Sequence, residues 1–408
     1  MLTNFLGGPK ILYINDRHEE KDTDKEDRRK LYDKRILPLL EESDFTVFGE
    51  KIDSFLLDYY KNLGLAGIKP ENIFYAGNYL DYPSLTKAIL ADAGLVEKLK
   101  REKFDCLIPY IESCDTEKLA QRIGTKLLRT ADFTDWINNK SNYRQVLKEL
   151  NFPVIPSDTV KTETGLQYFK ELKNQGFKKV VAKRERSVSG FGVFVIENEK
   201  DFKQCLEKDF REDENFVLEG FIEDIKHSPN LQYFITEKEI NFIAATDQLL
   251  EKDGVSYSGN IYPTALSAIP DISEKIGKMS QKICRYLQLK QCYGLVGIDY
   301  IITSDGRIYS TEVNVRLNGS TFPIFLAKKL FENKPDIFWM FKTFYFEPMS
   351  FEELFYKFGY FIKKRGDTGI LPVGVDLLES MGEGQFMIIS RLSKELYDLC
   401  GKFQTCLK

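Results

Sequence analysis

Histidine is nearly absent from this sequence: among 408 residues only His18 and His227 occur. A metal centre built on several histidines is therefore excluded, and a catalytic histidine is not expected. The seven cysteines are scattered and form no Cys-x-x-Cys pair. This argues against a zinc cluster and fits a reducing compartment, so we expect a cytoplasmic protein.

Long apolar runs and a strong charge of one sign are also missing. No apolar stretch approaches the roughly 20 residues that a membrane-spanning helix needs. The first ten residues, MLTNFLGGPK, lack the apolar core and the cleavage site of a signal peptide. The net charge is only −4, which gives no support for a nucleic-acid partner or a membrane surface. We therefore expect no membrane and no nucleic-acid partner.

Strand and helix patterns alternate in the first third of the chain. Short apolar runs predict strands, and apolar residues at three- and four-residue steps predict helices. Strands are expected at 10–15, 73–75 and 104–111, and helices at 53–63 and 84–100. Because strands that alternate with helices form parallel sheets, residues 1–125 are predicted to form an α/β domain.

The rest of the chain is a mixture of strands and helices. Residues 126–150 are predicted to be helical in two pieces, with a break at Asn138-Asn139. Residues 255–263, rich in Gly, Ser and Tyr, are predicted to be a loop. Residues 346–408 are expected to form a small α/β tail.

A hairpin is predicted between Gly297 and Arg316. Two apolar alternating runs flank Ser304-Asp305-Gly306, and Asp-Gly in such a position is a strong hairpin signal. If the strands pair through this turn, Asp299 and Glu312 can approach each other.

Strand alternation adds further members to this group. On the second strand it predicts one shared face for Ile308, Ser310, Glu312 and Asn314. Two carboxylates and an amide oxygen on a rigid hairpin suit Mg²⁺ that also carries phosphates, and Arg316 would meet an anion held there. The alternative is a solvated hairpin with ordinary surface charges.

A second candidate segment is the loop Glu185–Gly192 between two predicted strands. Its Gly and Ser residues allow backbone N–H groups to fold over a phosphate, and Lys183 would point at the same anion. The alternative is a plain hairpin turn. The chain has neither a Walker loop nor the Rossmann glycine fingerprint.

Two further features complete the set of candidates. The strand from Phe216 runs into a hinge at residues 219–223, which offers backbone groups to a purine edge, and Glu219 could accept from an amino group. Taken alone, Glu219 reads as an exposed acid. After the turn Asn318-Gly319, Ser320 is predicted to cap a helix that ends at Leu330. A helix N-terminus there favours an anionic substrate.

The order of these features resembles the ATP-grasp superfamily over about residues 126–330. The most specific match is Gly297-Ile298-Asp299 followed by Glu312-Val313-Asn314-Val315-Arg316. The resemblance implies a pre-ATP-grasp domain at 1–125, a small ATP-grasp subdomain at 126–225, a large one at 226–345 and a tail at 346–408. The tail is similar to that of ligases that join amino acids or peptides.

The resemblance also implies a role for each candidate residue, with ATP and one or two Mg²⁺ ions as cofactors. ATP phosphates would be bound by Lys140 and Lys183 and covered by Ser187, Ser189, Gly190 and Gly192. Adenine would be held by Glu219, Gly220, Phe221 and Ile222. Mg²⁺ would be bound by Asp299, Glu312 and Asn314. Arg316, together with Lys183, would be catalytic, and Asn318, Gly319 and Ser320 would lie near the substrate carboxylate.

The implied activity is an ATP-dependent carboxylate–amine ligation through an acyl phosphate, with amino acids or peptides as substrates. One alternative is an ATP-grasp enzyme that makes a thioester or carboxylates a small metabolite. Another is an ATP-binding interaction protein without catalysis. The sequence leaves open the identity of acid and amine and the oligomeric state, for which a homodimer is one option.

Overall fold

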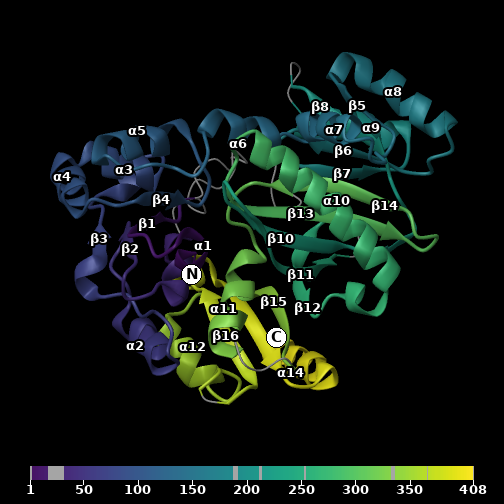
Figure 1. Ribbon diagram of the computed structural model, residues 1–408. Coiled ribbons are helices and arrows are strands. Elements are labelled where there is room, and N and C mark those ends of the chain that lie inside the picture. The colour runs from purple at the N-terminus through teal and green to yellow at the C-terminus, as the bar shows by residue number, and fades with distance from the viewer. Residues whose placement is uncertain are drawn as a thin grey trace.

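Three β-sheets organise the described part of the chain in the computed structural model (Figure 1). The structure describes residues 2–16, 32–186, 192–210, 214–251, 254–331, 336–364 and 366–407. One four-stranded sheet belongs to the N-terminal part, a second to the middle of the chain, and a nine-stranded sheet to the remainder.

The N-terminal sheet is parallel, with strand order β3-β2-β1-β4. This confirms the predicted parallel α/β arrangement. Strand β2 was not among the strands predicted from the sequence. The strands are β1 (Ile11–Ile14), β2 (Phe45–Phe48), β3 (Ile73–Tyr75) and β4 (Cys106–Pro109).

Helices surround this sheet. The helix predicted at 84–100 is divided in two, because the Asp92 side chain accepts the amide of Leu95 and starts a new helix. The helices are α1 (Thr3–Leu6), η2 (Asp33–Leu39), α2 (Ser54–Asn62), η3 (Pro70–Asn72), η4 (Tyr79–Asp81), α3 (Leu85–Ala91), α4 (Ala93–Glu102) and α5 (Cys114–Ile123).

Two helices, α6 (Ala131–Asn138) and α7 (Lys140–Glu149), lead from this part to the next sheet. The predicted break falls at Asn139, whose side chain accepts the amides of Ser141 and Asn142 and so begins α7. The helical prediction for residues 126–130 was wrong, since the first helix starts only at Ala131.

The middle sheet is antiparallel, with strand order β5-β8-β6-β7. Its strands are β5 (Ser157–Val160), β6 (Val180–Arg184), β7 (Val193–Ile196) and β8 (Phe216–Gly220). Helices α8 (Thr162–Asn174) and α9 (Glu199–Asp209) pack on it and share its apolar core.

The large sheet is antiparallel and has the order β14-β13-β10-β11-β12-β15-β17-β16, with β9 beside β13. The strands of the expected tail therefore extend this sheet rather than forming one of their own. The strands are β9 (Ile225–His227), β10 (Pro229–Ile235), β11 (Ile240–Leu250), β12 (Tyr257–Tyr262), β13 (Gly294–Thr303), β14 (Ile308–Asn314), β15 (Phe338–Tyr345), β16 (Gly369–Gly374) and β17 (Glu383–Ser390). The helices are η5 (Ala265–Ala268), α10 (Pro270–Leu289), α11 (Thr321–Phe331), α12 (Phe351–Phe358), α13 (Leu378–Met381) and α14 (Ser393–Cys406).

Strand β12 corrects the loop predicted at 255–263. Its polar composition resembles a loop, but it pairs with β11 on one side and β15 on the other. Gly259 permits the close approach, because a Cβ there would lie 1.9 Å from the carbonyl oxygen of Phe341. Pairing with neighbouring strands therefore outweighs the local preference for a turn.

The first and last parts of the chain share one apolar core. It contains Tyr13 and Phe48 of the parallel sheet together with Trp339 and Phe386 of the large sheet. Helices α2 and α12 lie side by side (Figure 1), with the rings of Phe55 and Phe351 5.9 Å apart. The N-terminal part is thus held against the C-terminal strands by extensive apolar burial.

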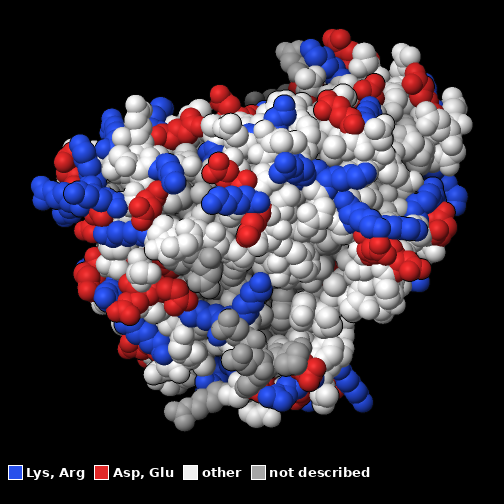
Figure 2. All heavy atoms as spheres, viewed as in Figure 1, with Lys and Arg blue, Asp and Glu red and all other residues white. Residues whose placement is uncertain are grey.

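Charge is mixed on the face of the molecule seen in Figure 2. Lys and Arg side chains are interspersed with Asp and Glu over the described part of this face, in line with the net charge of −4. Among the described residues, no helix is both long and apolar enough to span a membrane.

Candidate active site

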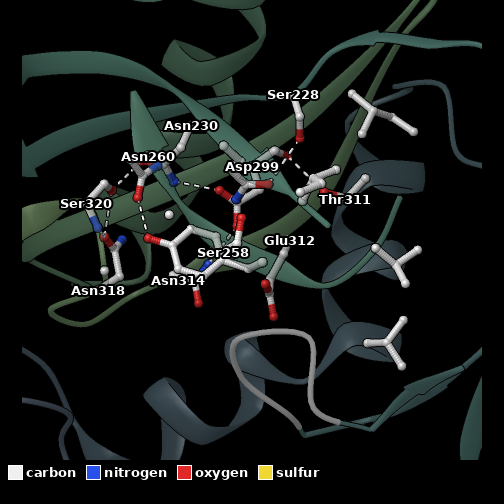
Figure 3. Close-up of a pocket in the computed structure, with 18 of the residues that line it drawn as sticks. Ser228, Asn230, Ser258, Asn260, Asp299, Thr311, Glu312, Asn314, Asn318 and Ser320 are labelled. Atoms are coloured by element: carbon white, nitrogen blue, oxygen red, sulfur yellow. Dashed lines mark hydrogen bonds between the residues drawn. The ribbon is translucent and has the colours of Figure 1, made fainter. Parts of the chain in front are cut away.

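A cavity of about 230 Å³ lies between the middle sheet and the large sheet. Part of its wall is drawn in Figure 3. Thirteen of the residues predicted from the sequence line it: Lys140, Lys183, Glu219, Gly220, Phe221, Ile222, Asp299, Glu312, Asn314, Arg316, Asn318, Gly319 and Ser320. These residues come from segments up to 180 positions apart, so the fold gathers them into one site.

The predicted hairpin forms from β13 and β14, and Asp299 pairs directly with Glu312 across it. On the other side of β13, Asn230 of β10 is the register partner of Asp299. The side chains of Asp299, Glu312 and Asn314 project into the same space (Figure 3).

The prediction that Ile308, Ser310, Glu312 and Asn314 share one face was wrong, because β14 contains a bulge. Tyr300 pairs with Ser310 while Asp299 pairs with Glu312, so Thr311 is the extra residue. Ser310 therefore points to the core, where its hydroxyl hydrogen-bonds Tyr143, and Ile308 packs in the same apolar cluster. Glu312 and Asn314 face the cavity instead.

The two carboxylates of the hairpin have different environments. Burial, followed by the negative charge of Glu312, raises the pKa of Asp299 to about 7. Asn230 and Asn314 donate to its two oxygens over 2.6 and 3.1 Å. Burial also acts to raise the pKa of Glu312, but the nearby Lys140 and Arg316 outweigh it and lower that pKa. The Lys140 Nζ lies 3.2 Å from Glu312 Oε1.

Glu219 is buried, which corrects its interpretation as an exposed acid. Only 4% of the residue is exposed, and its two oxygens accept from different cations: Lys183 at Oε1 and Arg144 at Oε2. Burial acts to raise the pKa of Glu219, but these two cations outweigh it and lower the pKa. Burial in turn lowers the pKa of Lys183.

A buried cluster of amides lies beside Asp299. Gln232 Nε2 donates to Asn318 Oδ1 over 2.7 Å and to Ser320 Oγ over 2.8 Å. Asn318 Oδ1 also accepts the amides of Ser320 and Thr321 at the start of α11. Asn318 thus caps this helix in place of the predicted Ser320. Within the described chain, Asn318 Nδ2 is buried and has no hydrogen-bond partner.

The N-terminal part contributes to the cavity wall through Arg35 and Tyr110. The Tyr110 hydroxyl accepts from Arg316 Nη1 over 3.2 Å, and the same nitrogen donates to the carbonyl of Leu317. Arg35 donates to Gln385 over 3.1 Å and stacks on Phe322 at 4.0 Å. The Arg316 side chain is therefore held by Tyr110 of the N-terminal part and by the carbonyl of its own neighbour Leu317.

The predicted glycine-rich loop is only partly described. Ser187, Ser189 and Gly190 lie outside the described residues. Gly192 begins the return to β7 with a φ of +69°, and its carbonyl accepts from Arg184 over 2.9 Å. It is not among the residues that line the cavity.

Sequence reasoning missed several residues of the site, notably Arg144, Asn230 and Gln232. Asn230 and Gln232 interrupt an apolar strand at a spacing of two, which is a readable signal for a polar patch on one face. Arg144 lies four residues after Lys140 and therefore on the same face of a helix. Its partner Glu219 is remote in sequence, so the pairing itself had no local signal.

The sequence of this chain is similar to a family model and to several ligases. The family model described as L-aspartate–L-methionine ligase, ATP grasp, matches residues 166–314. The [Butirosin acyl-carrier protein]–L-glutamate ligase of Niallia circulans is 28% identical over 265 residues, which cover 62% of each chain. The match thus spans less than two thirds of that relative's length. The D-alanine–D-alanine ligase of Lactobacillus acidophilus is 24% identical over 69% of this chain and 67% of its own.

Among solved structures, biotin carboxylase of Campylobacter jejuni superposes with a TM-score of 0.64. The superposition covers 95% of this chain and 89% of that one at 15% sequence identity, so it bears on the fold alone. The fold, the match of the family model and the relatives in sequence all agree. The chain therefore carries an ATP-grasp ligase domain, which the family model matches over residues 166–314.

Proposed function

We propose that this protein is an ATP-dependent carboxylate–amine ligase that forms an amide bond through an acyl phosphate. The observation that carries the proposal is the convergence on one cavity of Lys140, Lys183, Arg316 and the paired acids Asp299 and Glu312. Transfer of a phosphoryl group mainly requires that the protein position the reactants and neutralise charge. The three cations and the two carboxylates that line this cavity provide the positioning and the charge neutralisation.

The acids suit a bound Mg²⁺. Among the described residues no group of three His, Cys, Asp or Glu side chains could hold a metal ion. Mg²⁺ commonly uses only one or two carboxylates together with substrate phosphates and water, which matches Asp299 and Glu312 with Asn314 beside them. These residues would hold one or two ions, and the metal would neutralise charge on the phosphates.

The proposed reaction has two steps. An oxygen of the substrate carboxylate attacks the γ-phosphorus of ATP, the bond to the β–γ bridging oxygen breaks, and ADP leaves. The amine nitrogen then attacks the acyl carbon, phosphate leaves, and the nitrogen loses a proton. Arg316 would neutralise the transferring phosphoryl group, as preorganised charges of this kind do. The buried amide Nδ2 of Asn318 would donate to the substrate carboxylate.

We assign the apolar end of the cavity to adenine. Ile155, Val181 and Ile301 line it beside the hinge. The amides of Gly220 and Phe221 already donate to the carbonyls of Pro156 and Lys179. The hinge donor to the base would therefore be the amide of Ile222, with Glu219 accepting from the amino group.

Amino acids are the proposed substrates. The family model and the relatives carry names of ligases for aspartate, methionine, glutamate and D-alanine. We propose the cytoplasm as the site of the reaction, since all seven cysteines are free thiols. The same scaffold could instead make a thioester or carboxylate a metabolite, and mass spectrometry of the product separates these outcomes.

The test is a coupled assay of ATP hydrolysis over pooled amino acids and small peptides. We expect ADP and phosphate only when both a carboxylate and an amine are present, and a product whose mass equals the two substrates minus water. Glu312→Ala should abolish the signal, whereas Glu239→Ala, at an exposed position outside the cavity, should leave it unchanged. Tight ATP binding without turnover over a broad pool would instead favour the non-catalytic alternative.

A further inference from the structure

The carboxylate of Glu219 is shared between two cations in the structure. Lys183 Nζ binds Oε1 and Arg144 Nη2 binds Oε2. The three side chains come from β6, α7 and β8, and all are largely buried, with 14%, 14% and 5% of the side chain exposed for Lys183, Arg144 and Glu219. Only Lys183 and Glu219 line the cavity, so Arg144 reaches the carboxylate from behind.

Binding of ATP must rearrange this group. In the proposed function Lys183 binds the phosphates of ATP. Its ammonium group already lies at the cavity wall, so the triphosphate competes strongly with Glu219 for it. When Lys183 leaves, Oε1 of Glu219 is free to accept a new donor. The carboxylate is then buried with one cation removed, and a buried carboxylate without a partner is costly.

Arg144 is placed to remain paired with the Glu219 carboxylate when Lys183 leaves. It lies one helical turn after Lys140 on α7, and Tyr143, Val146 and Leu147 anchor this helix in an apolar core. Its guanidinium contacts the oxygen that Lys183 does not use. A guanidinium is always charged and holds a fixed orientation better than an ammonium group.

We propose that Arg144 is a positioning residue for adenine: it keeps Glu219 ionised and oriented while Lys183 moves to the triphosphate, so that Oε1 accepts the exocyclic amino group of the base. This inference rests on the proposed function and extends it to base selection. Guanine presents an acceptor oxygen where adenine presents the amino group, so an ionised Glu219 favours ATP over GTP.

The test measures nucleotide binding directly, by calorimetry with ATP and with GTP in the presence of Mg²⁺ and without acid or amine. Arg144→Met should weaken ATP binding by about tenfold or more, since a hydrogen bond between charged groups is lost. GTP binding should change little, so the preference for ATP falls. Arg144→Lys should recover part of the loss. Lys148→Met, one turn further along α7 and exposed, should match the wild type.

A double variant separates action through Glu219 from a general structural effect. In the background of Glu219→Gln, Arg144→Met should add little, because the group that it positions is already altered. Equal losses for ATP and GTP, additive losses in the double variant, or no loss in Arg144→Met would each overturn the inference while leaving the ligase proposal intact. Failure of the wild type to bind ATP would overturn both.

Discussion

At the scale of single residues, the site depends on the absence of a side chain at Gly297. A Cβ there would lie 2.2 Å from Asn318 Nδ2 and 2.9 Å from Gln232 Nε2. Neither amide has room to withdraw, because both belong to the buried cluster beside Asp299. Gly297→Ala should therefore lower the free energy of unfolding by about 1–3 kcal/mol, as overpacking does, and weaken activity. Urea denaturation measures the first effect.

A second glycine provides the matched control. Gly277 lies within α10, and a Cβ there would have no atom within 4 Å. Gly277→Ala should raise the free energy of unfolding by about 0.5–1 kcal/mol, because alanine loses less backbone entropy in a helix. A loss of stability at Gly277, or none at Gly297, would contradict the account of the amide cluster.

Residues could be predicted where the chemistry is local in sequence. Glu312, Asn314 and Arg316 follow one another at a spacing of two, and a strand places such residues on one face. The ion pairs of Glu219 with Lys183 and Arg144 were not predictable in this way. They join three elements, and their existence depends on how those elements pack.

At the scale of elements, the start of α7 sets the position of Lys140. The Asn139 side chain accepts the amide of Ser141 over 2.8 Å, and Lys140 is the first residue of the helix. Asn139→Ala should cost about 1 kcal/mol of stability through loss of the cap. Without the cap the first turn of α7 is less well ordered, and Lys140 is held less firmly at the cavity. The KM for ATP should therefore rise as well. Thermal unfolding and steady-state kinetics measure the two effects.

The equivalent change in a distant helix separates stability from function. Asp53 caps α2 by accepting the amide of Leu56 over 2.9 Å, and it does not line the cavity. Asp53→Ala should lose a similar amount of stability with no change in the KM for ATP. A rise of KM in both variants would mean that general destabilisation, and not the position of Lys140, explains the kinetics.

The hairpin shows where prediction of elements succeeds and where it ends. The Asp305-Gly306 turn and the alternating apolar residues were sufficient to predict β13 and β14 and the approach of Asp299 to Glu312. The bulge at Thr311 was not predictable, because the local pattern does not contain the contact of Ser310 with Tyr143 of α7, which is remote in sequence. It moved Ile308 and Ser310 to the face opposite Glu312.

At the scale of the whole molecule, the first and last segments meet around a buried acid. Asp376, after β16, has both carboxylate oxygens buried, and within the described chain neither has a hydrogen-bond partner. Burial, followed by the charge of Asp33, raises its pKa to about 8, while Lys34 and Arg35 act in the opposite direction. Burial also raises the pKa of Asp33 to about 6. The charged and titratable groups that face Asp376 are Asp33, Lys34 and Arg35 of η2, Tyr60 of α2 and Tyr79 of η4.

These values give stability a defined dependence on pH. Between about pH 4 and about pH 8 the folded protein holds a proton on Asp376 that the unfolded chain releases, so stability falls as the pH rises through this range. Asp376→Asn has no proton to lose at this position. The variant should therefore gain stability relative to the wild type as the pH rises from 5 to 8, when midpoints of urea unfolding are compared. Asp398→Asn, at an exposed position on α14, should show no such trend. A gain for Asp376→Asn that is the same at both pH values would show that the carboxyl group is already ionised at pH 5.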